Sequence, residues 1–191
     1  MDYVGGLITI FLVIIALHLI TEIRINYKNI RDEKRKAYLD VLQVMTKNEL
    51  YHKFNDQEGN KNFSQWITTY LTMKGYKDIK NVGDNGDNTI DLTAINPFGQ
   101  ETYIVCKLGN PDNWDRKISL SLLKELVGTM VANSIKNGLV ITMEKLDEKV
   151  LDYIAKIKIN GYNLKYIDGD TILKDLSDFR PVELKKLIHP I

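Results

Sequence analysis

One acidic residue and one lysine on neighbouring predicted strands are the strongest candidates for catalytic residues, by residue type and by spacing. Asp91 lies in a segment rich in β-branched residues, and Lys107 ends a second segment of the same kind. A carboxylate binds Mg²⁺, a hard cation that takes oxygen ligands, and the bound metal activates water and neutralises charge at phosphorus. A lysine ammonium stabilises the same charge. Held together on rigid strands, these groups are typical of a site that cleaves phosphodiesters.

The two segments are predicted to form a β-hairpin. The sequence Asn-Pro-Phe-Gly at 96–99 separates them, and its proline and glycine favour a tight turn. If the residues that flank this turn pair with each other, Asp91 pairs with Val105, and Lys107 lies on the same face as a diagonal neighbour. The alternative is a hairpin whose polar face carries both groups as ordinary solvated residues. Spacing alone favours that alternative.

The motifs around the hairpin occur in the order of a known family. The run Gly-Asp-Asn-Thr-Ile-Asp at 86–91 and the strand end Cys-Lys at 106–107 resemble the core of the Mrr-like type IV restriction endonuclease domain, which belongs to the PD-(D/E)xK nuclease superfamily. The flanking segments that resemble this family are a helix at 63–76, a helix at 123–128, a strand at 138–142 and a last strand at 166–169. The resemblance covers residues 62–176.

The resemblance implies a DNA endonuclease that depends on Mg²⁺ or Mn²⁺. By resemblance, Asp91 is a metal ligand and Lys107 the catalytic lysine, and Asp87 in the same acidic turn is a candidate second ligand. Two positions depart from the family pattern. Val105 stands where the family usually has Gln or Glu, and Ser64 stands where its first helix often has Glu.

Three basic residues after the hairpin are candidate DNA contacts. Arg116 and Lys117 lie in a predicted loop, which in the family is near the DNA, and Lys124 projects from the outer face of the next predicted helix. The alternative for each is an ordinary surface position. The formal net charge of +1 is no general basic signal, so a DNA partner must be argued from such local residues.

The N-terminus contains an uncharged apolar run at 4–20, broken only by Thr9 and His18. A spanning helix needs ~20 mostly apolar residues, and basic residues that follow such a segment face the cytoplasm. We therefore expect a single-pass membrane anchor at 3–21 with the C-terminal domain in the cytoplasm. A cleaved signal peptide fits less well, because it would need a positive leading region and a small-residue cleavage site. A core helix at a domain edge also fits less well, because it would show a polar stripe.

The chain is predicted to have four segments. The anchor at 1–21 is followed by a helical stalk or linker at 22–54, a nuclease-like domain at 55–178 and a C-terminal helix or tail at 179–191. Within the domain, the order helix, strand, hairpin, helix, strand, helix, strand predicts an α/β fold with a mixed central sheet flanked by helices, as in restriction endonucleases. The single cysteine excludes an internal disulfide, and the three histidines are scattered, which disfavours a zinc site.

Three functions remain open from the sequence. The first is a membrane-anchored, metal-dependent DNA endonuclease, with a homodimer as its candidate assembly. The second, motivated by Val105 and Ser64, is a nuclease-like fold with an impaired site that acts as a membrane-tethered DNA-binding or scaffold module. The third takes the anchor as the main feature, with the domain binding a protein partner in a membrane complex.

Overall fold

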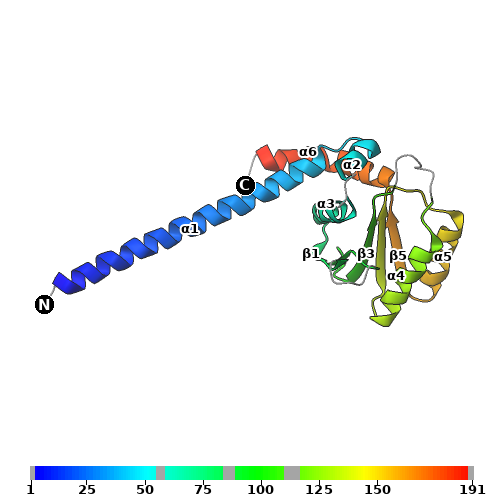
Figure 1. Ribbon diagram of the computed structural model, residues 1–191, viewed down its shortest axis with the longest axis horizontal. Coiled ribbons are helices and arrows are strands. Elements are labelled where there is room, and N and C mark those ends of the chain that lie inside the picture. Colours follow the sequence, from blue (N-terminus) through cyan, green and yellow to red (C-terminus); the bar gives the residue numbers. More distant parts are fainter. Residues whose placement is uncertain (1–2, 55–58, 84–88, 110–116, 189–191) are drawn as a thin grey trace. The chain divides into compact units, whose positions relative to one another are not determined.

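The computed structural model describes residues 3–54, 59–83, 89–109 and 117–188 (Figure 1). The chain divides into two units, Met1–Leu39 and Asp40–Ile191. Helix α1 (Tyr3–Leu42) has 40 residues and continues from the apolar run into the charged residues that follow it. In the described part of the chain, no helix is both long enough and apolar enough to cross a membrane. The anchor expected at 3–21 therefore has no support from the structure.

The second unit is built on a five-stranded sheet in the order β1-β2-β3-β4-β5. β1 pairs with β2 and β2 with β3 in antiparallel directions, whereas β3, β4 and β5 run parallel. The strands are β1 (Lys77–Asn81), β2 (Leu92–Ile95), β3 (Glu101–Lys107), β4 (Asn137–Thr142) and β5 (Asn163–Ile167). These mixed directions confirm the predicted α/β class with a mixed central sheet.

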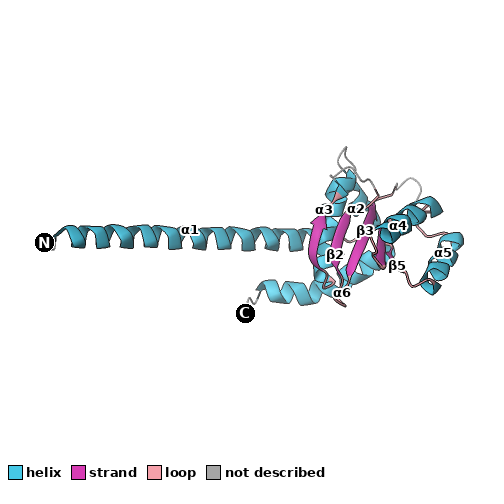
Figure 2. Ribbon diagram, turned by 90° about the horizontal axis from the view of Figure 1, so that it is seen from below, coloured by secondary structure: helices cyan, strands magenta, loops and turns pink. Residues whose placement is uncertain are grey.

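Helices cover the two faces of this sheet, as Figures 1 and 2 show. One face carries α2 (Lys47–Phe54), α3 (Gly59–Met73) and α6 (Gly169–Ile188), and the other carries α4 (Leu120–Ala132) and α5 (Glu148–Ile159). The apolar side chains of β3 alternate between these two layers. Ile104 and Cys106 pack toward α3, and Val105 packs toward α4 and α5. Because successive strand residues face opposite sides, the central part of β3 is buried from both sides.

The segment between α1 and α2 is a turn, within the range 22–54 that the sequence predicts to be a helical stalk or linker. The backbone N–H groups of Met45 and Thr46 donate to Oε2 of Glu49 at 2.8 and 3.2 Å, and the Glu49 N–H donates to Oγ1 of Thr46 at 3.1 Å. This reciprocal arrangement satisfies donors at the start of a helix. It explains why α2 begins as a separate helix.

The core of the second unit includes residues before the predicted domain boundary near residue 55. Val41, Val44, Leu50 and Phe54 are buried in the layer that contains α3 and α6. Apolar burial is the main favourable contribution to folding, so these residues are part of the domain that the sheet organises. The second compact unit starts at Asp40.

The C-terminal helix also differs from its expected form. The sequence predicts a C-terminal helix or tail at 179–191, but this stretch up to Ile188 is the end of α6, which is continuous through Pro181. Proline removes one helical hydrogen bond, and α6 is held by other contacts. Arg180 donates from Nε to the carbonyl of Leu42 at 3.0 Å and from Nη2 to the carbonyl of Val44 at 3.2 Å.

Candidate active site

The turn of the hairpin forms as its sequence predicts. Oδ1 of Asn96 accepts two backbone N–H groups from the residues that follow, at 2.9 and 3.1 Å. Gly99 has a φ of +78°, a conformation that glycine adopts without a steric penalty. The residues that flank the turn, Ile95 and Glu101, pair with each other. The turn therefore sets the register that brings the start of β2 to the end of β3.

Counted outward from the turn, the regular pairing of β2 with β3 ends at Leu92, the neighbour of the candidate acid Asp91. Leu92 faces Ile104, and the Asp91 N–H also donates to the carbonyl of Ile104, at 3.0 Å. Two residues therefore oppose one, and Asp91 does not take the regular position opposite Val105. Its side chain continues the ladder instead, because Oδ2 accepts the backbone N–H of Cys106 at 2.7 Å. This bond orients the carboxylate over the end of β3.

Lys107 lies close enough to Asp91 for the two charges to interact. It is the last residue of β3, half-buried, and faces Thr142 of β4. Burial raises the pKa of the Asp91 carboxyl above its ordinary value, and the Cys106 N–H and the charge of Lys107 partly offset this rise by stabilising the carboxylate. Neither side chain is covered completely. The pair thus differs from freely solvated surface residues, as the candidate chemistry requires.

The two positions that depart from the family pattern carry no carboxylate and are buried, so they cannot bind a metal ion. Val105 is 1% exposed and packs between the sheet and the helices α4 and α5, and Ser64 is 3% exposed in α3. No group of three or more His, Cys, Asp or Glu side chains that could hold a metal occurs among the described residues. The second candidate ligand, Asp87, lies outside those residues.

The carboxylate oxygens of Asp91 are of the chemical type that binds divalent cations. Oδ2 is oriented by the Cys106 N–H, and Oδ1 lies on the side of Gly83, where an added Cβ would be 3.7 Å from this oxygen. Carboxylate oxygens are the ligands that Mg²⁺ and Mn²⁺ prefer. Asp91 therefore suits the metal, and a further ligand must come from elsewhere.

The candidate DNA contacts fall in different settings. Lys124 is exposed on α4, next to the buried Leu123. Lys117 is exposed, but its Nζ lies 3.5 Å from Oδ1 of Asp147, which partly neutralises its charge. Arg116 lies outside the described residues.

Cys106 contributes its backbone and not its thiol. The side chain is buried, and burial raises the pKa of the thiol well above its ordinary value, with the nearby Asp91 charge acting in the same direction. A nucleophilic cysteine needs a low pKa and access to the substrate. This residue is therefore part of the core.

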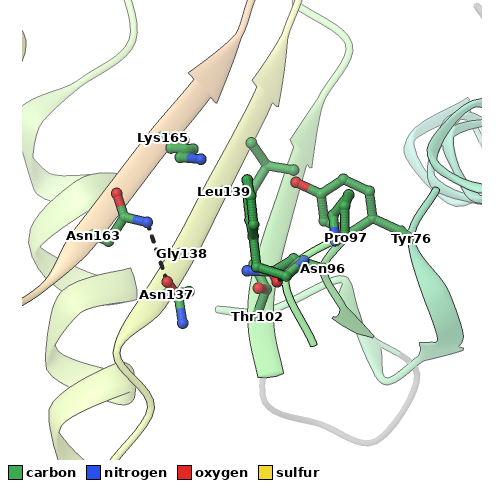
Figure 3. Close-up of a pocket in the computed structure, with 10 residues that line it drawn as sticks. Tyr76, Asn96, Pro97, Thr102, Asn137, Gly138, Leu139, Asn163 and Lys165 are labelled. Carbon is green, nitrogen blue, oxygen red and sulfur yellow. Dashed lines mark hydrogen bonds between the residues drawn. The ribbon is translucent and has the colours of Figure 1, made fainter. Parts of the chain in front are cut away.

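A small pocket that the sequence does not predict lies at the opposite end of the strands. It is lined by residues near the starts of β3, β4 and β5, among them Thr102, Asn137 and Asn163 (Figure 3). Nδ2 of Asn163 donates to Oδ1 of Asn137 at 3.1 Å, and Nδ2 of Asn137 donates to the carbonyl of Glu101. These amides bond to one another, so their role is to join the strands.

Residues 56–176 match the family model Mrr_cat, a restriction endonuclease domain. The chain belongs to this restriction endonuclease family. No curated protein and no solved structure matches the chain significantly. Membership of the family confirms the resemblance of the sequence and makes DNA the expected substrate of this nuclease domain. Restriction endonuclease domains generally use divalent metal ions.

Proposed function

We propose that this restriction endonuclease domain hydrolyses DNA phosphodiesters with a divalent metal ion held at Asp91. The observation that carries the proposal is the orientation of Asp91 by the Cys106 N–H, beside Lys107, at the ends of adjacent strands. An acid and a cation in this position are the groups that phosphodiester hydrolysis needs.

Each residue has a defined role in this proposal. When bound, Mg²⁺ or Mn²⁺ supplies Lewis-acid activation of water and neutralises charge on the phosphate. Asp91 provides a ligand oxygen, and its bond to Cys106 reduces the freedom that the carboxylate would lose on binding. Lys107 stabilises the negative charge on the phosphoryl oxygens. Asp87 is proposed as the second carboxylate, in place of the one that Val105 does not supply.

Nicking of supercoiled plasmid DNA by the full chain tests the proposal. We expect cleavage with Mg²⁺ or Mn²⁺ and none in EDTA. Asp91→Asn and Lys107→Met are each expected to reduce the rate by ~10²-fold or more, the order found when one charge-stabilising group is removed. Asp87→Asn should do the same if Asp87 is the second ligand. Lys158→Met, an exposed residue of α5, is the control for loss of a lysine.

Absence of cleavage by the wild type in both metals would contradict the nuclease proposal. The second candidate is a DNA-binding module with an impaired site, and the burial of Val105 and Ser64 favours it. Salt-dependent DNA binding without cleavage would support this candidate. The homodimer, the membrane location and the cytoplasmic position of the domain stay predictions from the sequence.

A further inference from the structure

Strand β1 contains an irregularity that turns two lysines toward the same face of the sheet. Lys77 pairs with Ile95 and Lys80 pairs with Thr93. Two residues separate the lysines, but only one separates their partners, so β1 bulges between them. In a regular strand, residues three apart point to opposite faces. The bulge cancels this alternation.

The bulge is held by an uncommon backbone conformation. Asp78 has a φ of +50°, in the left-handed region that residues other than glycine seldom adopt. Bulges are frequent at sheet edges and next to active sites, where they change the direction of a side chain. A strained residue at a bulge is a reason to look for a function of the side chains that it aligns.

The face that carries the two lysines is also the face of the candidate site. Lys80 pairs with Thr93, which in turn pairs with Tyr103. Tyr103 and Lys107 are four residues apart on β3, so both side chains point to the same side of the sheet. Helix α4 packs against β3 and β4, and α5 packs against β5. The described helix that packs against β1 is α3, which lies on the other face.

The lysines on this face are available for an anion. Both Lys77 and Lys80 are exposed, and neither forms an ion pair with a residue in the described ranges. Their partners are two residues apart on β2, so the lysines stand ~7 Å apart along the strand. Glu101 is exposed in the same row as Lys77, and Lys80 lies in the row nearer to Asp91. We therefore expect Lys80 to contribute more than Lys77.

We infer that Lys77 and Lys80 form a phosphate-binding surface that holds duplex DNA as one strand enters the Asp91–Lys107 site. The inference rests on the proposed function and specifies where the substrate lies. Phosphate contacts position a duplex without depending on its sequence. The exposed Lys77 and Lys80 on this face give a strand a path toward the scissile position.

Binding of a short DNA duplex to the full chain in EDTA, where hydrolysis does not occur, tests this surface. We expect Lys77→Gln with Lys80→Gln to weaken binding by ~10-fold or more at low salt and to reduce the slope of log K against log salt by about 2, since each phosphate contact contributes ~0.9. The charge-matched control is Lys156→Gln with Lys158→Gln on α5, where both residues are exposed.

A second pair of variants tests the bulge without removing a lysine. Asp78→Gly and Asp78→Val change the charge equally, but glycine accepts the left-handed conformation and valine does not. We expect the valine variant to bind DNA more weakly than the glycine variant, with circular dichroism confirming that both are folded.

Three results would overturn the inference. The first is an unchanged salt slope in the double β1 variant, and the second is an equal loss in the α5 control. Either would remove this surface while leaving the nuclease proposal intact, provided that the wild type binds and cleaves DNA. The third is a wild type that does neither, which would remove the proposed function and this surface together.

Discussion

At the scale of single residues, the partial burial of the Asp91 carboxylate lowers the stability of the folded state. Burial disfavours its charged form, and the Cys106 N–H and Lys107 offset only part of this penalty. A carboxylate that is destabilised in the folded chain, yet points to a partly open position beside a lysine, is suited to binding rather than to stability. The same environment makes its ionisation measurable through the stability of the protein.

Asp91→Asn should change the pH dependence of stability in a defined direction. The raised pKa of Asp91 means that the folded state binds its proton more tightly than the unfolded state does. Its contribution to stability is therefore fully present below the ordinary pKa of 3.8 and is lost as the pH rises through the raised value. The variant lacks this titration, so the wild type should lose stability relative to it over that range. Urea unfolding of both proteins between pH 3.5 and 7, an interval chosen around this range, measures the difference.

At neutral pH the variant should thus be at least as stable as the wild type while its cleavage is lost. A stability difference between the two proteins that does not change over this pH interval would contradict the direction of the pKa shift. A matched Asp147→Asn variant at the start of α5 provides the control for replacing an acid by an amide.

Lys107 should hold down the pKa of its neighbour. Because the charge of Lys107 lowers the pKa of Asp91, Lys107→Met is expected to raise this pKa further. The carboxyl resonance of Asp91, followed by nuclear magnetic resonance as a function of pH, gives the value directly. The same pKa in both proteins would show that the two charges do not interact, which would remove the main electrostatic reason for assigning them to one site.

At the scale of elements, the site depends on a hairpin that is anchored by its turn and on helices tied to the sheet. The Asn96 side chain closes the turn, and the register that follows carries Asp91 to the end of β3. On the side of α3 and α6, the Tyr70 hydroxyl donates to Oδ2 of Asp175 at 2.5 Å, and Lys74 pairs with the same carboxylate. These bonds hold α6 against α3 beneath the strands.

Arg180→Ala should destabilise the domain without a direct effect on cleavage. The substitution removes the two bonds from the guanidinium to the carbonyls of Leu42 and Val44. Hydrogen bonds that involve a charged group contribute ~1.5–3 kcal/mol each, so a loss of about 2–4 kcal/mol is expected because solvent replaces part of them. Arg180→Lys retains the charge but not the fork of donors, and should recover only part of the loss.

Denaturant unfolding measures this effect, and plasmid nicking below the unfolding transition provides the functional comparison. A stability equal to the wild type would show that these bonds are not maintained in solution.

At the scale of the whole molecule, the family match and the folded core begin at different residues. The match begins at residue 56, whereas buried apolar residues of the second unit begin at Val41. Helix α2 is tied to α6 by Lys47, whose Nζ lies 2.6 Å from Oδ2 of Asp170. The residues before the match therefore complete one face of the nuclease core.

A chain that starts at residue 56 should consequently be less stable than one that starts at residue 40. It loses the burial of five apolar residues, Val41, Leu42, Val44, Leu50 and Phe54. Each such side chain contributes ~1.5–3 kcal/mol when fully buried, which is comparable to the whole stability of a small domain. Thermal unfolding of the two fragments tests this, with the full chain as reference. Equal midpoints would contradict it.

Local chemistry in the sequence determined the hairpin turn, the order of helices and strands, and the two groups at the candidate site. Proline, glycine and asparagine act on their own backbone, and apolar periodicity acts within one element, so short segments were sufficient. The family motifs added the expected fold and the expected roles of Asp91 and Lys107, and the family match supports that fold.

Only the tertiary structure decided where the regular ladder ends and what surrounds the acid. The bond from Cys106 to Asp91, the bulge at Asp78 and the burial of Val41 each depend on residues far apart in the sequence. A shift of one residue in strand register turns every side chain to the other face. Such shifts arise when distant elements pack together, and no local pattern in the chain encodes them.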